Sequence, residues 1–177
     1  SLPLFEYLLT DLFDHADGPL TLEAYREAGG AAGALARRAG EVFGGLAPEE
    51  QDAVRQVFLR LANPTDVDAP GWTRRRLPAR ELRSLGIDPA ALGSAIGALV
   101  DARLVTTDRD PVTGRPVVDI AHEALLAEWP RLAGWLDDAR DDLHRHVALT
   151  AAVTDWHRAD EDPGYLWSDA RLADYAS

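Results

Sequence analysis

The sequence contains neither cysteine nor lysine, and it has no long apolar run. Without cysteine, a disulfide framework and a thiolate metal site are both excluded. All 18 basic residues are arginine, which excludes an ordinary P-loop, because that loop places a lysine on the β- and γ-phosphates. No apolar stretch approaches the roughly 20 residues of a membrane helix, and the first residues lack the basic region of a signal peptide. A cytoplasmic setting is therefore the default expectation.

What is present is the composition of an ordinary globular protein, with 46% hydrophobic and 27% charged residues. The formal net charge is -12 and is unevenly distributed. Residues 1–47 carry three arginines against seven acids, residues 48–121 ten against eleven, and residues 122–177 five against twelve. Because phosphate backbones are bound by clustered basic side chains, this balance disfavours nucleic acid as a partner.

The pattern of apolar residues predicts a mainly α-helical protein in three parts. Residues 1–47 are expected to form a small helical unit, with helices near 5–13, 22–28 and 31–46 separated by Gly-Pro and Gly-Gly breaks. Residues 126–177 are expected to form a C-terminal helical region with a long apolar seam, in which Pro130 starts a new helix. That seam comprises Leu125, Trp129, Leu132, Leu136, Leu143, Val147, Val153 and Trp156.

The middle part, residues 48–125, is predicted to be a winged-helix domain. Pro48 starts a helix whose buried face holds Val54, Val57, Phe58 and Leu61, and residues 64–73 form a loop. Leu77 begins a short strand and residues 79–85 a short helix. Asp88-Pro89 opens the next helix, with Leu92, Ile96, Leu99 and Val100 inward. Strands at 104–107 and 117–120, joined by a turn-rich segment, complete a β-hairpin.

Two short segments resemble a known family. Residues 121–123, Ala-His-Glu, lie directly after the predicted hairpin and before the run Trp129-Pro130-Arg131-Leu132. They are similar to the hydrophobic-His-acid motif that ends the winged helix of STAND-class signalling NTPases, relatives of the NB-ARC and apoptotic regulators. Residues 1–4, Ser-Leu-Pro-Leu, resemble the Gly-x-Pro motif of the helical lid in the same class. The likeness is greatest to the bacterial branch that carries WD40-type repeats.

The resemblance implies a regulatory segment without the phosphate-binding core. The family's P-loop and Mg²⁺-binding Asp have no counterpart here and are expected upstream, in a parent protein that is an ATPase. In that parent His122 is expected to contact the β-phosphate of ADP, Pro3 to pack near the adenine and Glu123 to support the switch. ADP, or ATP with Mg²⁺, is expected in the full-length protein and not on this segment alone. The expected partners are the upstream NTPase core and C-terminal sensor or WD40-type repeat domains, with no membrane.

Each of these residues has a plainer interpretation. His122 is equally suited to capping the next helix, and Glu123 is an acid favoured by the dipole of a first helical turn. Pro3 fits a helix start. Trp129, Pro130 and Trp135 are better explained as core packing than as a ligand site.

Three other functions stay open. A winged-helix DNA-binding module would use residues 88–103 as its recognition helix, but that helix offers little to read bases, and the Arg74–Arg76 cluster more commonly pairs with nearby acids. An independent enzyme lacks a recognisable nucleophile and base, and Asp141 with His144 makes a poor metal site. A protein-interaction scaffold would use the apolar seam of the last third. The segment is therefore expected not to be an enzyme.

Overall fold

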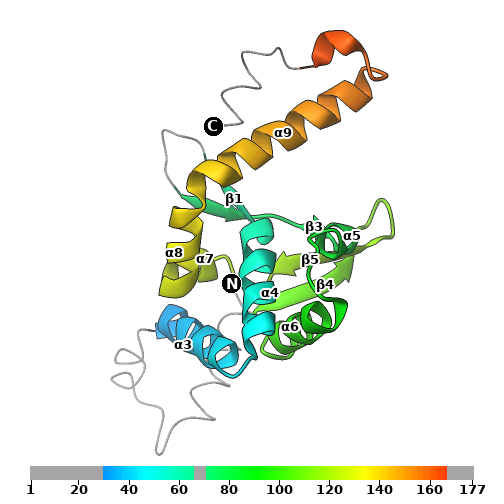
Figure 1. The fold of residues 1–177 in the computed structure, drawn as a ribbon. Helices are drawn as coiled ribbons and strands as arrows, with labels where there is room; N and C mark the ends of the chain where they lie inside the picture. The colour runs from blue at the N-terminus through cyan, green and yellow to red at the C-terminus, as the bar shows by residue number, and fades with distance from the viewer. Residues whose placement is uncertain (1–29, 66–70, 167–177) are drawn as a thin grey trace, which may run out of the picture. The chain divides into compact units, whose positions relative to one another are not determined.

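The computed structural model describes residues 30–65 and 71–166 (Figure 1). The chain divides into two compact units, Ser1–Asp137 and Asp138–Ser177. The described part is mostly helical with small antiparallel sheets, as the composition and periodicity predict. Pro3 and the helices predicted before Gly30 lie outside the described residues, as does most of the helix predicted at 165–175.

The first two described helices begin and end near the predicted residues. Helix α3 spans Gly30–Gly44 and buries Ala34, Leu35, Ala39 and Phe43. Helix α4 spans Pro48–Leu61, with Pro48 in its first turn. The carboxylate of Glu50 accepts a hydrogen bond from the backbone N–H of Ala47 at 2.9 Å, which satisfies a donor at the helix start. The predicted buried face of α4 is confirmed, since its four members are 0% exposed: Val54, Val57, Phe58 and Leu61.

Two further helices precede the predicted hairpin. Helix α5 spans Ala79–Arg83 and helix α6 spans Pro89–Asp101. Asp88 caps α6 as predicted, since its carboxylate accepts from the N–H groups of Ala90 and Ala91. The predicted inward face needs a correction: α6 buries Leu92, Ala95 and Leu99, while Ile96 and Val100 are half-buried. Ala95 is 0% exposed, and α6 packs against α4.

The strands form two antiparallel sheets. Strand β3 (Leu77–Pro78), β5 (Pro116–Ile120) and β4 (Val105–Arg109) lie in the order β3-β5-β4, which confirms the hairpin and the short strand at Leu77. Strands β1 (Ala62–Pro64) and β2 (Trp72–Arg74) pair with each other, Asn63 opposite Thr73. The prediction of a simple loop over 64–73 was therefore wrong at both ends. These two strands are only three residues long, too short to show a periodicity of two.

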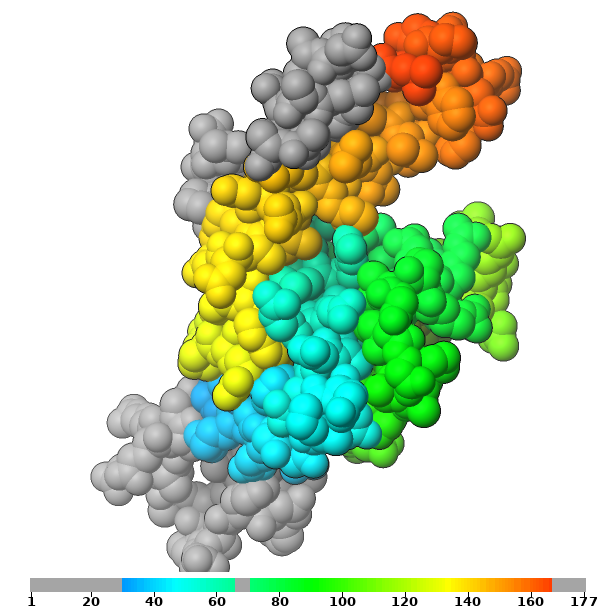
Figure 2. Space-filling model, in the orientation of Figure 1, coloured from blue at the N-terminus to red at the C-terminus, as the bar shows by residue number. Residues whose placement is uncertain are grey.

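Helix α4 lies in the middle of the first unit (Figure 1). Helices α5 and α6 and the three-stranded sheet lie on one side, and α7 (Leu125–Glu128) with α8 (Pro130–Asp138) lies on the other. In Figure 2 the α4 atoms fill the space between these two groups on the face in view. Trp129, at the α7–α8 junction, is 2% exposed and contacts Phe43, Phe58 and Trp135 edge-on. The interpretation of the tryptophans as core packing is thereby confirmed for Trp129.

The second unit consists mainly of α9 (Arg140–Arg158), followed by the short 3₁₀ helix η1 (Pro163–Tyr165). The predicted seam continues through Leu143, which is buried, but Val147 and Val153 are 39% and 51% exposed. The predicted seam is thus buried at Leu143 and exposed at Val147 and Val153. A periodic stripe shows only that one face is apolar, and whether another element covers it depends on the fold. Among the described helices, none is long and apolar enough to cross a membrane.

Candidate functional site

The Ala-His-Glu motif of residues 121–123 lies between the end of the hairpin and the start of the next helix. Strand β5 ends at Ile120, and the N–H of Ala121 donates to the carbonyl of Leu104 at 3.0 Å. The carbonyl of His122 then accepts from the N–H of Leu125, which opens α7. Ile120 and Leu125 are both fully buried. His122 is thus held from both sides by buried neighbours, and its half-buried side chain has a defined place beside the sheet.

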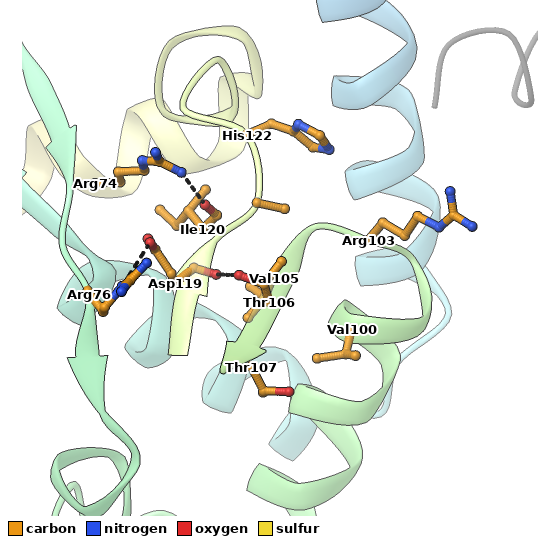
Figure 3. A pocket seen from close by; sticks show the side chains of 11 residues that line it. Arg74, Arg76, Val100, Arg103, Val105, Thr106, Thr107, Asp119, Ile120 and His122 are labelled. Atoms are coloured by element: carbon orange, nitrogen blue, oxygen red, sulfur yellow. Dashed lines mark hydrogen bonds and ion pairs between the residues drawn. The ribbon is translucent and has the colours of Figure 1, made fainter. Parts of the chain in front are cut away.

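A pocket of about 530 Å³ opens at this end of the sheet (Figure 3). Its apolar wall consists of Val100, Val105 and Ile120, and its polar lining is dominated by cations. The lining includes three arginines, one carboxylate and the imidazole of His122. The full lining is Arg74, Arg76, Val100, Arg103, Val105, Thr106, Thr107, Asp119, Ile120, Ala121 and His122. In a chain of net charge -12 this is a local concentration of positive charge. Such a pocket favours anions.

The Arg74–Arg76 cluster divides its three guanidinium groups among different partners. Arg75 pairs with Glu81 at 3.1 Å, and Arg76 pairs with Asp119 at 3.7 Å. Arg74 donates instead to the carbonyl of Ile120 at 3.4 Å, which leaves its charge without a carboxylate in that contact. The expectation that such a cluster pairs with neighbouring acids is thus met for Arg75 and Arg76. Arg74 contributes its charge to the pocket.

Arg103 is a pocket residue that the sequence did not single out. It follows α6 with a backbone φ of 55°, in the left-handed region that favours glycine. Its N–H donates to the carbonyl of Val100, and the N–H of Leu104 donates to that of Leu99. These are the two hydrogen bonds of a Schellman motif, in which the left-handed position is usually glycine. An arginine where glycine is usual could have pointed to Arg103 from the sequence, but this signal was missed.

A comparison with family models decides the relationship of the chain. The model described as novel STAND NTPase 1 matches residues 1–164. This chain belongs to that family. No curated protein and no solved structure matches it.

Of the residues that the STAND resemblance singles out, the structure places one in the pocket. His122 lines it, whereas Glu123 is exposed in the turn before α7 and is not among the lining residues. Pro3 lies outside the described residues. Asp119 and Thr106, which also line the pocket, were not predicted, and the hydroxyl of Thr106 donates to the carbonyl of Asp119 at 3.5 Å. Within the described ranges, no group of three or more acidic or histidine side chains is placed to hold a metal ion.

The electrostatics of this STAND segment act directly on His122. Burial, and then the positive charge of Arg74, lower the pKa of His122 below its ordinary value of 6.5. Both causes disfavour the imidazolium, so the ring is neutral at neutral pH. A neutral imidazole still donates one N–H to an anion. A bound anion would oppose the field of Arg74 and raise the pKa of His122 again.

This depressed pKa predicts a pH-dependent stability. Because unfolded chains bind the proton more readily at this site, the contribution of His122 to the free energy of unfolding is fully present above pH 6.5. That contribution is lost as the pH falls through the lower folded pKa of His122. Urea unfolding between pH 5 and 8 measures the slope, and His122→Gln should flatten it. The control is His157→Gln, an exposed histidine near Glu161. Equal slopes in the parent chain and in His122→Gln would contradict the assignment.

Proposed function

We propose that this chain is the regulatory segment of a nucleotide-dependent signalling switch. It closes over ADP bound by an upstream P-loop NTPase core and relays the nucleotide state to C-terminal sensor or repeat domains. The observation that carries the proposal is the basic pocket that contains His122 at the end of β5, in a chain of the novel STAND NTPase 1 family. A ligand that contacts two parts of a protein in one state alone supplies the differential affinity that a switch requires.

The order of elements around the pocket supports a winged-helix domain as the moving part. After helix α4 and the short β1–β2 pair come β3, α5, α6 and the β4–β5 hairpin, and β5 lies between β3 and β4 in the sheet. A helical unit closed by a three-stranded sheet and a hairpin wing is a compact body that shifts as one piece. His122 lies at the end of that sheet, so a contact at His122 acts on the whole domain.

The residues present fit the phosphate end of a nucleotide. The imidazole of His122 and the guanidinium of Arg74 are hydrogen-bond donors of the kind that recognise phosphate oxygens. The pocket volume of about 530 Å³ lies within the 300–1,000 Å³ range of small-molecule sites. Bound ADP supplies the negative charge that bridges the two parts, and this chain supplies donors and a dry wall. The Mg²⁺ and the hydrolytic chemistry belong to the upstream core, so the segment itself is not an enzyme.

DNA binding has less support from the same residues. Helix α6 stands where a winged helix has its recognition helix, and its exposed residues are Pro89, Ala90, Gly93, Ser94 and Asp101. None of them is an arginine, asparagine or glutamine, the side chains that make the bidentate contacts to base edges in the major groove. Salt-dependent retention of the chain on heparin or DNA resin would reverse this conclusion.

The test is the nucleotide content of the longest natural protein that contains this segment. We expect stoichiometric ADP after denaturation and chromatography. In His122→Ala the loss of one charge-assisted hydrogen bond, worth about 1.5–3 kcal/mol, should weaken ADP retention about ten- to hundredfold.

The matched control is His144→Ala, because His144 lies on α9 and does not line the pocket. ADP bound equally well by the native protein and by His122→Ala would overturn the proposed contact. Absence of nucleotide from the native protein would leave a protein-interaction scaffold.

A further inference from the structure

The pocket holds charge that the structure does not neutralise. Asp119 pairs with Arg76, while Arg74 donates to a main-chain carbonyl. Among the described residues, the guanidinium of Arg103 has no hydrogen-bond or ion-pair partner. Figure 3 shows the side chains of Arg103 and His122 extending to the same side of the sheet. Arg74 and Arg103 therefore line the same pocket as His122 with no carboxylate partner among the described residues.

We propose that Arg103 and Arg74 act with His122 as one diphosphate-binding site, in which Arg103 is the principal anion-binding residue. This inference rests on the proposed function and adds to it two residues that come from other elements: Arg74 from β2 and Arg103 from the turn after α6. Guanidinium groups bind phosphate oxygens through two parallel N–H donors, and the charge of the group does not depend on pH near neutrality. His122, which is neutral, adds a directional donor.

The backbone at Arg103 is independent support for a binding role. A left-handed conformation after a helix is easiest for glycine, so a long side chain with a β-carbon there is a local cost to folding. Residues held in sparsely populated conformations gather at ligand sites, because the surrounding structure holds them there for another purpose. At this position Arg103, in the turn between α6 and β4, is an exposed residue among those that line the pocket.

The apolar wall of the pocket strengthens the attraction between its arginines and an anion. Val105 and Ile120 are 1% and 0% exposed, and both belong to the paired strands β4 and β5. A low-dielectric wall reduces the screening of a nearby charge, so an anion in front of it is held more strongly than on an open surface. The pocket thus combines fixed cations, a neutral donor and a dry wall on rigid elements.

The test uses inorganic pyrophosphate as the probe and the complete 177-residue chain as the protein. Binding is followed by titration calorimetry and by the NMR shifts of the His122 ring. We expect Arg103→Gly to weaken pyrophosphate binding about tenfold or more. The same variant should raise Tm by about 2–4 °C, because glycine suits the left-handed position. Arg74→Gln should weaken binding in the same direction.

A matched control is Arg83→Gln, which removes one exposed arginine from α5 outside the pocket lining. A higher Tm together with weaker pyrophosphate binding in Arg103→Gly, and no change of either in Arg83→Gln, would support the site. Equal pyrophosphate affinity in Arg103→Gly and the parent chain would overturn it, as would no measurable binding to the parent. Tighter binding of duplex DNA than of pyrophosphate would also overturn it.

The failure of this inference and that of the proposed function are distinguishable. If Arg103→Gly binds pyrophosphate normally while His122→Ala still releases ADP from the longer protein, the proposed switch is supported and the proposed arginine site is wrong. If the arginine variants lose pyrophosphate while His122→Ala retains ADP, the pocket binds oligophosphate anions but does not hold the ADP bound by the upstream core.

Discussion

Trp129→Ala should lower the free energy of unfolding of the first unit by about 3–5 kcal/mol, the usual range for removing a buried tryptophan. Trp129 is 2% exposed, and its ring centroid lies 5.5 Å from that of Phe58 and 6.0 Å from that of Phe43. These partners come from α4 and α3, so the substitution loosens three elements together. Such a loss is a large part of the roughly 5–15 kcal/mol that stabilises a typical domain.

Urea unfolding followed by far-ultraviolet circular dichroism measures this effect without relying on tryptophan fluorescence. The control is Val112→Ala, because Val112 is 91% exposed at the tip of the β4–β5 hairpin and should have almost no effect. Trp129→Phe should recover part of the loss, since an aromatic ring remains among Phe43, Phe58 and Trp135. A change below about 1 kcal/mol in Trp129→Ala would contradict the packing described here.

Ile120→Ala should cost about 2–5 kcal/mol and should also disturb the pocket. Ile120 is 0% exposed, pairs with Val105 across the hairpin and directly precedes the segment that carries His122. Its carbonyl also accepts from Arg74, so a shift of the strand end moves that guanidinium. Removal of the side chain leaves a cavity under the apolar wall, and the neighbouring strands close over it only in part.

Thermal unfolding and pyrophosphate titration together test this second prediction. We expect Ile120→Ala to lower both the Tm and the affinity for pyrophosphate. Arg103→Gly should instead raise the Tm and lower the affinity. The control is Val112→Ala, because Val112 is 91% exposed and is not among the residues that line the pocket. An unchanged Tm in Ile120→Ala would show that the end of β5 is not part of the core.

Local signals in the sequence predicted the elements around the site. Asp88-Pro89 marked the start of α6, Pro48 marked the start of α4, and Pro130 marked the start of α8. Each of these rests on chemistry within one helical turn, which does not depend on distant residues. The hairpin was predicted for the same reason, since its strands are separated by a turn with strong local preferences.

What the sequence left open or predicted wrongly depends on a partner from another element. The α9 stripe reads as one seam, yet Val147 and Val153 are exposed, whereas Leu143 is buried. Periodicity identifies an apolar face but not what covers it. Likewise, β1 and β2 exist because Asn63 and Thr73 meet across an intervening loop, which a three-residue pattern does not reveal.

The sequence by itself determined the helical class, the hairpin and the place of His122 after a strand, because propensity, capping and turn chemistry act between near neighbours. It also determined, by the lack of lysine, that no ordinary P-loop lies in this chain. Only the tertiary structure decided that Arg74, Arg103 and His122 line one pocket. They come from a strand, a helix end and a loop, and folding brings them together because the pairing of β3 with β5 and the hydrogen bond from Arg74 to Ile120 join segments distant in the sequence.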